Sequence, residues 1–245
     1  MGFFRNAVLA SIAAAATAGS AFASIPAVSV RIEQVGSGFT TINPTANPVE
    51  GGYTYSGAVS LWGFQSTFDL STNSKAATGN NAFGGFFTLK NTTATVQQFI
   101  IDMTITNDPF TGNALAGGSV AGVLLGGPNG GVLQGVGNAP VWQAIINRDS
   151  GSTTIASLMN GNPFSVTTGA NQSGSIAREF FGNDPQIPSL PIGPLGSSRT
   201  IRLQFTLNGG SQVSLSTSFV VQVPAPGAVA LLGLAGLAGR RRRRD

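Results

Sequence analysis

Few side chains in this 245-residue chain could carry out chemistry, because only 9% of its residues are charged and it contains neither His nor Cys. Without Cys there is no thiol nucleophile and no thiolate metal site. Without His there is no Ser-His-Asp triad and no imidazole ligand for zinc. The sequence therefore excludes the commonest hydrolytic and metal-dependent mechanisms, and we expect no cofactor.

Carboxylates are the remaining catalytic groups, since a pair of them can hydrolyse a glycosidic bond. Most acidic residues of this chain stand alone, in turns or at strand positions that would face solvent. We therefore predict that the protein is not an enzyme, with a hydrolase built on carboxylates as an alternative. The acidic residues between the two chain ends are Glu33, Glu50, Asp69, Asp102, Asp108, Asp149, Glu179 and Asp184.

Two further alternatives concern binding. Tyr53 and Tyr55 would share one face of a strand and, with Trp62, would offer a platform on which sugar rings stack, although aromatic side chains more commonly pack in the core. Oxygen atoms of Asn107–Asp108 and Asp149 would suit Ca²⁺, but no Asp-x-Asp loop accompanies them. We keep carbohydrate binding as the alternative function and predict no metal site.

The net charge of +4 comes from the two ends of the chain. Arg5 and Arg240 to Arg244 supply six of the 13 basic residues, whereas between Ser24 and Pro226 seven basic residues face eight acidic ones. Nucleic-acid binding requires a basic surface. We therefore expect no nucleic-acid partner.

The first 23 residues are organised as a signal peptide. Arg5 precedes an apolar run over residues 7–18, and Ala21 and Ala23 stand three and one positions before Ser24. A positive segment, a short apolar core and small residues in an A-x-A arrangement are the features that signal peptidase recognises. We expect a helix that is cleaved before Ser24 and directs export across the inner membrane; the alternative is a buried Ala-rich helix.

The last 23 residues combine a proline motif, an apolar run and a basic cluster. Val223, Pro224, Ala225 and Pro226 precede the apolar residues 227–239, and Arg240, Arg241, Arg242, Arg243 and Arg244 follow them. As a helix the apolar run would be roughly 20 Å long, shorter than the hydrocarbon core of about 30 Å. Because arginines snorkel and stay on the cytoplasmic side, this segment predicts a weak, transient membrane anchor. A plain tail anchor is the alternative.

This order of parts resembles the PEP-CTERM sorting signal found on exported proteins of Gram-negative bacteria. Pro224 and Pro226 match the two prolines of its Pro-Glu-Pro motif, while Ala225 stands where the family usually has Glu. The resemblance covers residues 223–245. It implies that an exosortase, a membrane-embedded cysteine enzyme, processes the chain, and it links the chain to the cell surface and to exopolysaccharide production.

Residues 24–222 are predicted to form one β domain. Several segments alternate with a period of two, which is typical of strands with one buried face, and no long segment has a helical period. Many short strands with Gly- and Asn-rich turns favour an antiparallel β-sandwich, Ig-like or jelly-roll-like. The clearest alternating sets are Val28, Val30 and Ile32; Phe99, Ile101, Met103 and Ile105; Ile201, Leu203, Phe205 and Leu207; and Val213, Leu215, Thr217, Phe219 and Val221.

Some local predictions accompany this fold. Asn129–Gly130 and residues 208–210 are typical of hairpin turns, and residues 141–147 are expected to form one helical turn. Four prolines repeat every three residues, which would align their rings on one edge of a polyproline II helix. This segment would serve as a stiff crossover between strands or, alternatively, as a docking ligand; the prolines are Pro185, Pro188, Pro191 and Pro194.

These features together predict an exported, non-enzymatic protein of the cell surface or extracellular matrix. It would be held transiently in the membrane by its C-terminal helix before processing. Its expected partners are signal peptidase, an exosortase-type enzyme and the membrane. Under the alternative of a carbohydrate-binding module, its ligand would be exopolysaccharide.

Overall fold

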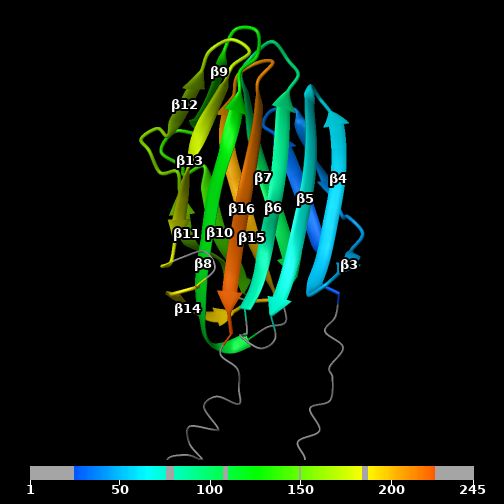
Figure 1. Cartoon of the computed structure of the whole chain (residues 1–245), viewed down its shortest axis with the longest axis vertical. Helices are drawn as coiled ribbons and strands as arrows, with labels where there is room; N and C mark the ends of the chain where they lie inside the picture. Colours follow the sequence, from blue (N-terminus) through cyan, green and yellow to red (C-terminus); the bar gives the residue numbers. More distant parts are fainter. Residues whose placement is uncertain (1–24, 76–79, 107–109, 149, 184–186, 224–245) are drawn as a thin grey trace, which may run out of the picture.

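The computed structural model describes residues 25–75, 80–106, 110–148, 150–183 and 187–223. Within these ranges every regular element is a β-strand, and the strands form two antiparallel sheets packed face to face (Figure 1). This confirms the predicted all-β sandwich. Each sheet has eight strands, so the fold is larger than an immunoglobulin domain of about seven to nine strands. The two predicted terminal helices lie outside the described residues.

Sheet A, as we name it, has the strand order β11-β10-β15-β7-β1-β2, with β9 beside β15 and β12 beside β9. No helix with the length and apolar character needed to cross a bilayer occurs in the described ranges. The strands of sheet A are β1 (Val28–Gln34), β2 (Gly38–Ile42), β7 (Gln97–Thr106), β9 (Gly131–Gly135), β10 (Trp142–Arg148), β11 (Gly151–Leu158), β12 (Ser165–Thr168) and β15 (Ser198–Leu207).

Sheet B has the order β13-β8-β16-β6-β5-β4-β3, and β14 also pairs with β8. The chain passes repeatedly from one sheet to the other, so strands that are consecutive in sequence often lie in opposite layers. The strands of sheet B are β3 (Asn47–Val49), β4 (Gly52–Leu61), β5 (Phe64–Lys75), β6 (Asn80–Asn91), β8 (Phe110–Leu125), β13 (Ser173–Phe181), β14 (Leu190–Leu195) and β16 (Gln212–Gln222).

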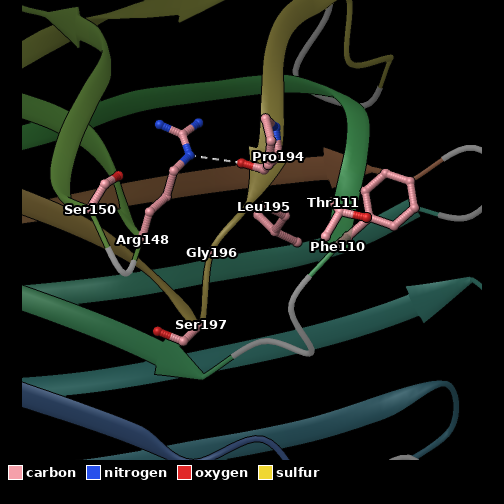
Figure 2. Close-up of a pocket in the computed structure, with 8 residues that line it drawn as sticks. All are labelled: Phe110, Thr111, Arg148, Ser150, Pro194, Leu195, Gly196 and Ser197. Atoms are coloured by element: carbon pink, nitrogen blue, oxygen red, sulfur yellow. Dashed lines mark hydrogen bonds between the residues drawn. The ribbon is translucent and has the colours of Figure 1, made fainter.

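The proline-rich segment contributes the irregular strand β14, which pairs with β8. Arg148 at the end of β10 holds it in place, since its Nε donates to the carbonyl of Pro194 at 2.9 Å (Figure 2) and its Nη2 to that of Ile192 at 2.7 Å. Pro188 is buried while Pro191 and Pro194 are exposed. The prediction that the rings share one edge is therefore wrong for the described prolines.

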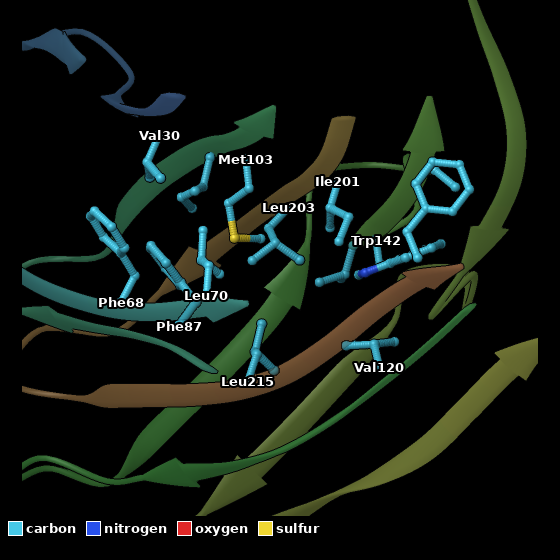
Figure 3. Packing of buried hydrophobic residues seen from close by; sticks show 14 of the residues in the cluster. Val30, Phe68, Leu70, Phe87, Met103, Val120, Trp142, Ile201, Leu203 and Leu215 are labelled. Atoms are coloured by element: carbon cyan, nitrogen blue, oxygen red, sulfur yellow. The ribbon is translucent and has the colours of Figure 1, made fainter. Parts of the chain in front are cut away.

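Alternation of side chains places one face of each sheet in a common core. All members of the four alternating sets predicted from the sequence are buried, which confirms them as inward faces. Phe68, Leu70 and Phe87 of sheet B belong to the same hydrophobic cluster as Met103 and Leu203 of sheet A (Figure 3). Because burying one such side chain contributes about 1.5–3 kcal/mol, these inner faces supply the main stabilisation.

The helical turn predicted for residues 141–147 is wrong, because this segment forms strand β10. β10 lies between β11 and β15, with Trp142, Ala144 and Ile146 buried. Trp142 Nε1 donates to the buried hydroxyl of Thr217 at 2.6 Å and so links the two sheets. Ile145 is apolar as well, which obscured the alternation in the sequence. The segment is a strand because it pairs with β11 on one side and β15 on the other.

The two turns predicted as hairpins instead cross between the sheets. β8 belongs to sheet B and β9 to sheet A, and likewise β15 belongs to sheet A and β16 to sheet B. The turn chemistry itself was correct, since Gly130 and Gly210 have positive φ angles of 86° and 73°. A turn reverses the chain but does not determine which strands pair.

The two ends of the sandwich differ in what they hold. Residues 25 and 223, the first and last described, lie at one end, which we call the terminal end (Figure 1). The crossing turns 126–130 and 208–211 lie at the other, the loop end, where the Gly127 N–H donates to Ser211 Oγ at 3.3 Å. Both chain ends therefore leave the described domain on the same side.

Candidate functional site

A network of polar side chains covers the outer face of sheet A, and the strand register arranges it. Arg31 of β1 stands opposite Asp102 of β7, and Asp102 stands opposite Arg202 of β15. Because the alternate residues of these strands point into the core, these three point outward. They form one charged row across three strands of what we call the polar face.

Two ion pairs organise this row. Arg202 donates from Nε to Asp102 Oδ1 at 2.7 Å and from Nη2 to Oδ2 at 2.8 Å, a bidentate arrangement. These hydrogen bonds raise the pKa of the Arg202 guanidinium. Arg31 pairs with Glu33 at 2.6 Å, and its guanidinium lies 4.5 Å from the centre of the Phe39 ring. Phe39, on the edge strand β2, is 59% exposed.

Neutral groups continue the network toward β11. The hydroxyls of Thr104 and Thr200 are hydrogen-bonded at 2.8 Å. Asn147 Nδ2 donates to Ser198 Oγ at 2.9 Å, and Asn147 Oδ1 accepts from Ser152 Oγ at 2.7 Å. An open hollow of about 280 Å³ lies over these groups, lined by Asp102, Thr104, Ile145, Asn147, Ser152, Thr200 and Arg202.

The lining of this hollow can both donate and accept hydrogen bonds. Guanidinium, amide and hydroxyl groups donate, while carboxylate, amide and hydroxyl oxygens accept. Each group is already held by a neighbour, so little side-chain entropy is lost when a ligand binds. Such an arrangement suits a ligand that is rich in hydroxyl groups.

Glu33 and Asp102 are the described acidic residues that share this face, and each is ion-paired with an arginine. The other described carboxylates are dispersed: Glu50 lies in the turn between β3 and β4, Asp69 faces outward from sheet B, and Glu179 accepts the Met159 N–H at 2.6 Å. Asp108, Asp149 and Asp184 lie outside the described residues. Among the described carboxylates, the two that share a face are therefore both already engaged by arginines.

The aromatic platform predicted from Tyr53, Tyr55 and Trp62 is not formed. The two tyrosines share a strand face, as predicted, but it is the inner one. Tyr55 is 1% exposed, its hydroxyl donates to the carbonyl of Pro26 at 2.7 Å, and burial raises its pKa. Trp62 stands in the turn between β4 and β5, with its ring over Gly38 of β2.

The sequence reasoning missed the polar face, although part of its signal was visible. Arg31, Glu33, Asp102 and Thr104 occupy the outward positions of two strands that were correctly predicted. The alternation does not show that β1, β7, β15 and β10 lie side by side. That order alone brings their outward residues into one surface.

Other predicted site residues fall largely beyond the described ranges. No group of three or more metal-ligating side chains occurs among the described residues, and the Ca²⁺ alternative at Asn107–Asp108 and Asp149 lies outside them. So do Ala21, Ala23, Ser24, Pro224–Pro226 and Arg240–Arg244. Val223 is described and packs against the core.

A second hollow, of about 310 Å³, opens at the terminal end (Figure 2). Its one charged lining residue, among those the structure describes, is Arg148, which is engaged with carbonyls of β14. We assign this residue a structural role. The lining residues are Phe110, Thr111, Arg148, Ser150, Pro194, Leu195, Gly196 and Ser197.

No protein-family model matches the sequence, and no curated protein matches it. Among solved structures, the chain is similar to the carbohydrate-binding module TmCBM61 in complex with β-1,4-galactotriose, with 9% identity over 65% of this chain and 88% of that one, at a TM-score of 0.23. It is also similar to the enzymatically active domain of bacteriophage CBA120 tailspike protein 4, with 8% identity over 69% and 19% of the two chains and a TM-score of 0.25. Likenesses at these TM-scores carry no argument about function.

Proposed function

We propose that this chain is an exported, non-enzymatic protein of the cell surface or matrix, and that the polar face of sheet A binds polysaccharide. The observation that carries the binding proposal is the hydrogen-bonded network around Asp102 and Arg202, beneath an open hollow of about 280 Å³. This revises the alternative drawn from the sequence, since the site moves from the tyrosines to the outer face of sheet A.

The chemistry of polysaccharides favours this face over the others. Asp102 and Arg202 keep further acceptor and donor capacity beyond the two hydrogen bonds between them, and this capacity can pair with sugar hydroxyls. The network extends across several strands, so an extended chain could lie along it. Phe39 adds an exposed apolar surface at the β2 edge.

The placement of the two chain ends agrees with surface display. Both leave from the terminal end of the sandwich (Figure 1). If the C-terminal segment anchors the chain, the terminal end is the one nearest the membrane. The loop end and the polar face then stay accessible from outside.

Titration calorimetry of the full chain with exopolysaccharide fragments tests the binding proposal. We expect Asp102→Asn to weaken binding about tenfold or more, because a charge-assisted pair is lost. Asp69→Asn is the matched control, since Asp69 lies on the outer face of sheet B. Absence of heat with the unchanged chain, or equal weakening by both substitutions, would contradict the proposal.

The sorting proposal has its own test, in the arginine cluster. Moving each arginine through the bilayer centre costs about 2.5–3.5 kcal/mol on insertion scales. Replacing Arg240 to Arg244 with Ser should therefore let the tail pass outward uncut, whereas Lys at the same positions should preserve processing. Mass spectrometry of the protein from envelope and medium distinguishes these products. A Ser variant that matures to the normal mass refutes the retention role.

A further inference from the structure

One strand of sheet B has an edge that no other described strand covers. β3 pairs with β4 only over residues 52–54, and β5 lies on the other side of β4. No described strand pairs with residues 55–61 of β4 on the side where β3 lies, and we call them the open edge. Ser56, Ala58, Ser60 and Leu61 are all exposed.

The hairpin geometry shows which backbone groups point outward. β4 and β5 are joined by Trp62 and Gly63, both with positive φ (44° and 89°), as in a type I′ turn. In such a hairpin the flanking pair Leu61–Phe64 exchanges hydrogen bonds, and every second residue along β4 does the same. Ser56, Ala58 and Ser60 must then direct their N–H and C=O groups away from β5.

Two other edges, those of β13 and β11, are interrupted or contact each other. The register of β13 breaks between Ile176 and Glu179, next to the charged Arg178. β11 contacts β13, and Glu179 accepts the Met159 N–H there, which links the two layers. Proteins usually block pairing at an edge with a bulge, a proline or a charged residue. The open edge has none of these three features.

We propose that the open edge pairs with the same edge of a second copy of this chain, in antiparallel register about Ala58. Sheet B of one copy and sheet B of the other would then join into one continuous sheet across a two-fold axis. This is β-strand addition in its self-complementary form, with the same patch on both partners.

The length and composition of the edge fit this register. Outward groups of Ser56 would meet those of Ser60, and Ala58 would meet itself, which allows about six backbone hydrogen bonds. The open edge is bounded by β3 at one end and by the Trp62–Gly63 turn at the other. These two features of one copy limit the length of strand that the second copy can add. In this register the second copy's strand ends with its Leu61 opposite Tyr55, one position before Thr54, where β3 begins.

Side chains agree with this pairing as well. On the outer face Ser56 would lie beside Ser60, and this sheet already pairs hydroxyls across strands, with Thr88 to Ser214 at 3.0 Å and Ser119 to Ser218 at 3.1 Å. On the inner face Val59 and Leu61, which are only partly covered, would gain apolar neighbours. No like charges would face each other.

Cysteine cross-linking of the full chain tests the register, because the protein has no Cys of its own. Opposed residues of a hydrogen-bonded pair lie about 5.5 Å apart between Cα atoms, within the disulfide range of about 4.4–6.8 Å. Ala58→Cys should give a covalent dimer on mild oxidation. Ser60→Cys and the outer-face control Ser216→Cys should not, and equal cross-linking of all three overturns the proposal.

Sedimentation velocity of the full chain in detergent supplies the second measurement. We expect a concentration-dependent dimer that Ala58→Lys weakens at least about tenfold, since two lysines would meet on the axis. Ser216→Lys places the same charge on the same face, away from the edge, and should leave the dimer intact. A chain that is monomeric throughout, or a dimer unaffected by Ala58→Lys, overturns the proposal.

Discussion

The two ends of the sandwich each bury a polar side chain, with opposite consequences. At the loop end Asn91 is fully buried, and its Nδ2 donates to the carbonyls of Thr95 at 2.8 Å and Leu207 at 2.9 Å. Its Oδ1 accepts from the Thr93 N–H at 3.0 Å and hydroxyl at 2.8 Å. Every donor and acceptor of this amide is satisfied, so it fastens two loops together.

Toward the terminal end Arg199 is also fully buried, but its charge is not compensated. Its Nη1 and Nη2 donate to the carbonyl and side-chain oxygens of Asn81 at 3.0 and 2.6 Å, and Nε has no partner. No described carboxylate contacts it, and burial lowers its pKa to about 9. Its guanidinium lies 5.8 Å from the Phe219 ring centre.

The comparison shows that burial of a polar group stabilises a fold only when its bonding capacity is used. Asn91 is neutral and fully bonded, whereas Arg199 carries a charge that its neutral partners cannot balance. We therefore expect Asn91 to stabilise the loop end. We expect burial of Arg199, near the start of β15, to reduce the stability of the fold at the terminal end.

The largest effect is expected for Asn91→Ala, which should reduce the free energy of unfolding by about 2–4 kcal/mol. Four hydrogen bonds are lost, and the backbone groups they served stay buried. Urea unfolding of the full chain measures the loss. Asn147→Ala, the same substitution on the half-buried polar face, should cost less than about 1 kcal/mol; equal costs would contradict the contrast.

Arg199→Met should behave oppositely at neutral pH. Removing the charge relieves its desolvation, while Asn81 loses two hydrogen bonds, so the variant should lose no more than about 1 kcal/mol or even gain stability. The measurement is again the urea midpoint. A loss as large as that of Asn91→Ala would show that the guanidinium has compensation that its described contacts do not provide.

The stability difference between the unchanged chain and Arg199→Met should depend on pH. The folded pKa lies below the value in the unfolded chain, so above pH 9 the unfolded state binds more protons and the unchanged chain gains stability as pH rises. By pH 10 that gain should reach about 1 kcal/mol. Parallel unfolding curves from pH 7 to 10 test this, and a constant difference would contradict it.

Ser211→Ala should cost less than Asn91→Ala, about 1 kcal/mol. Ser211 Oγ donates to the Gly130 carbonyl at 3.2 Å and accepts the Gly127 N–H at 3.3 Å, longer bonds than those of Asn91. Thermal unfolding detects a change of this size. A larger loss than for Asn91→Ala would show that the crossing turns, and not Asn91, stabilise the loop end most.

Alternation in the sequence correctly predicted the inward faces of β1, β7, β15 and β16, because a strand half-buried in a sheet must alternate. It did not predict β10, where Ile145 interrupts the pattern and pairing with β11 and β15 supplies the missing constraint. It likewise did not reveal that Asn91 and Arg199 are buried, since a polar residue in a strand is expected to face solvent.

The sequence alone determined the all-β class, the limited catalytic chemistry and the prediction of export and sorting, because composition, periodicity and terminal segments are local properties. The tertiary structure decided the strand order, and with it the polar face and the open edge. These depend on which strands lie side by side, with turns such as Asn129–Gly130 leading into the opposite sheet. Strand pairing is a long-range choice that a local pattern cannot encode.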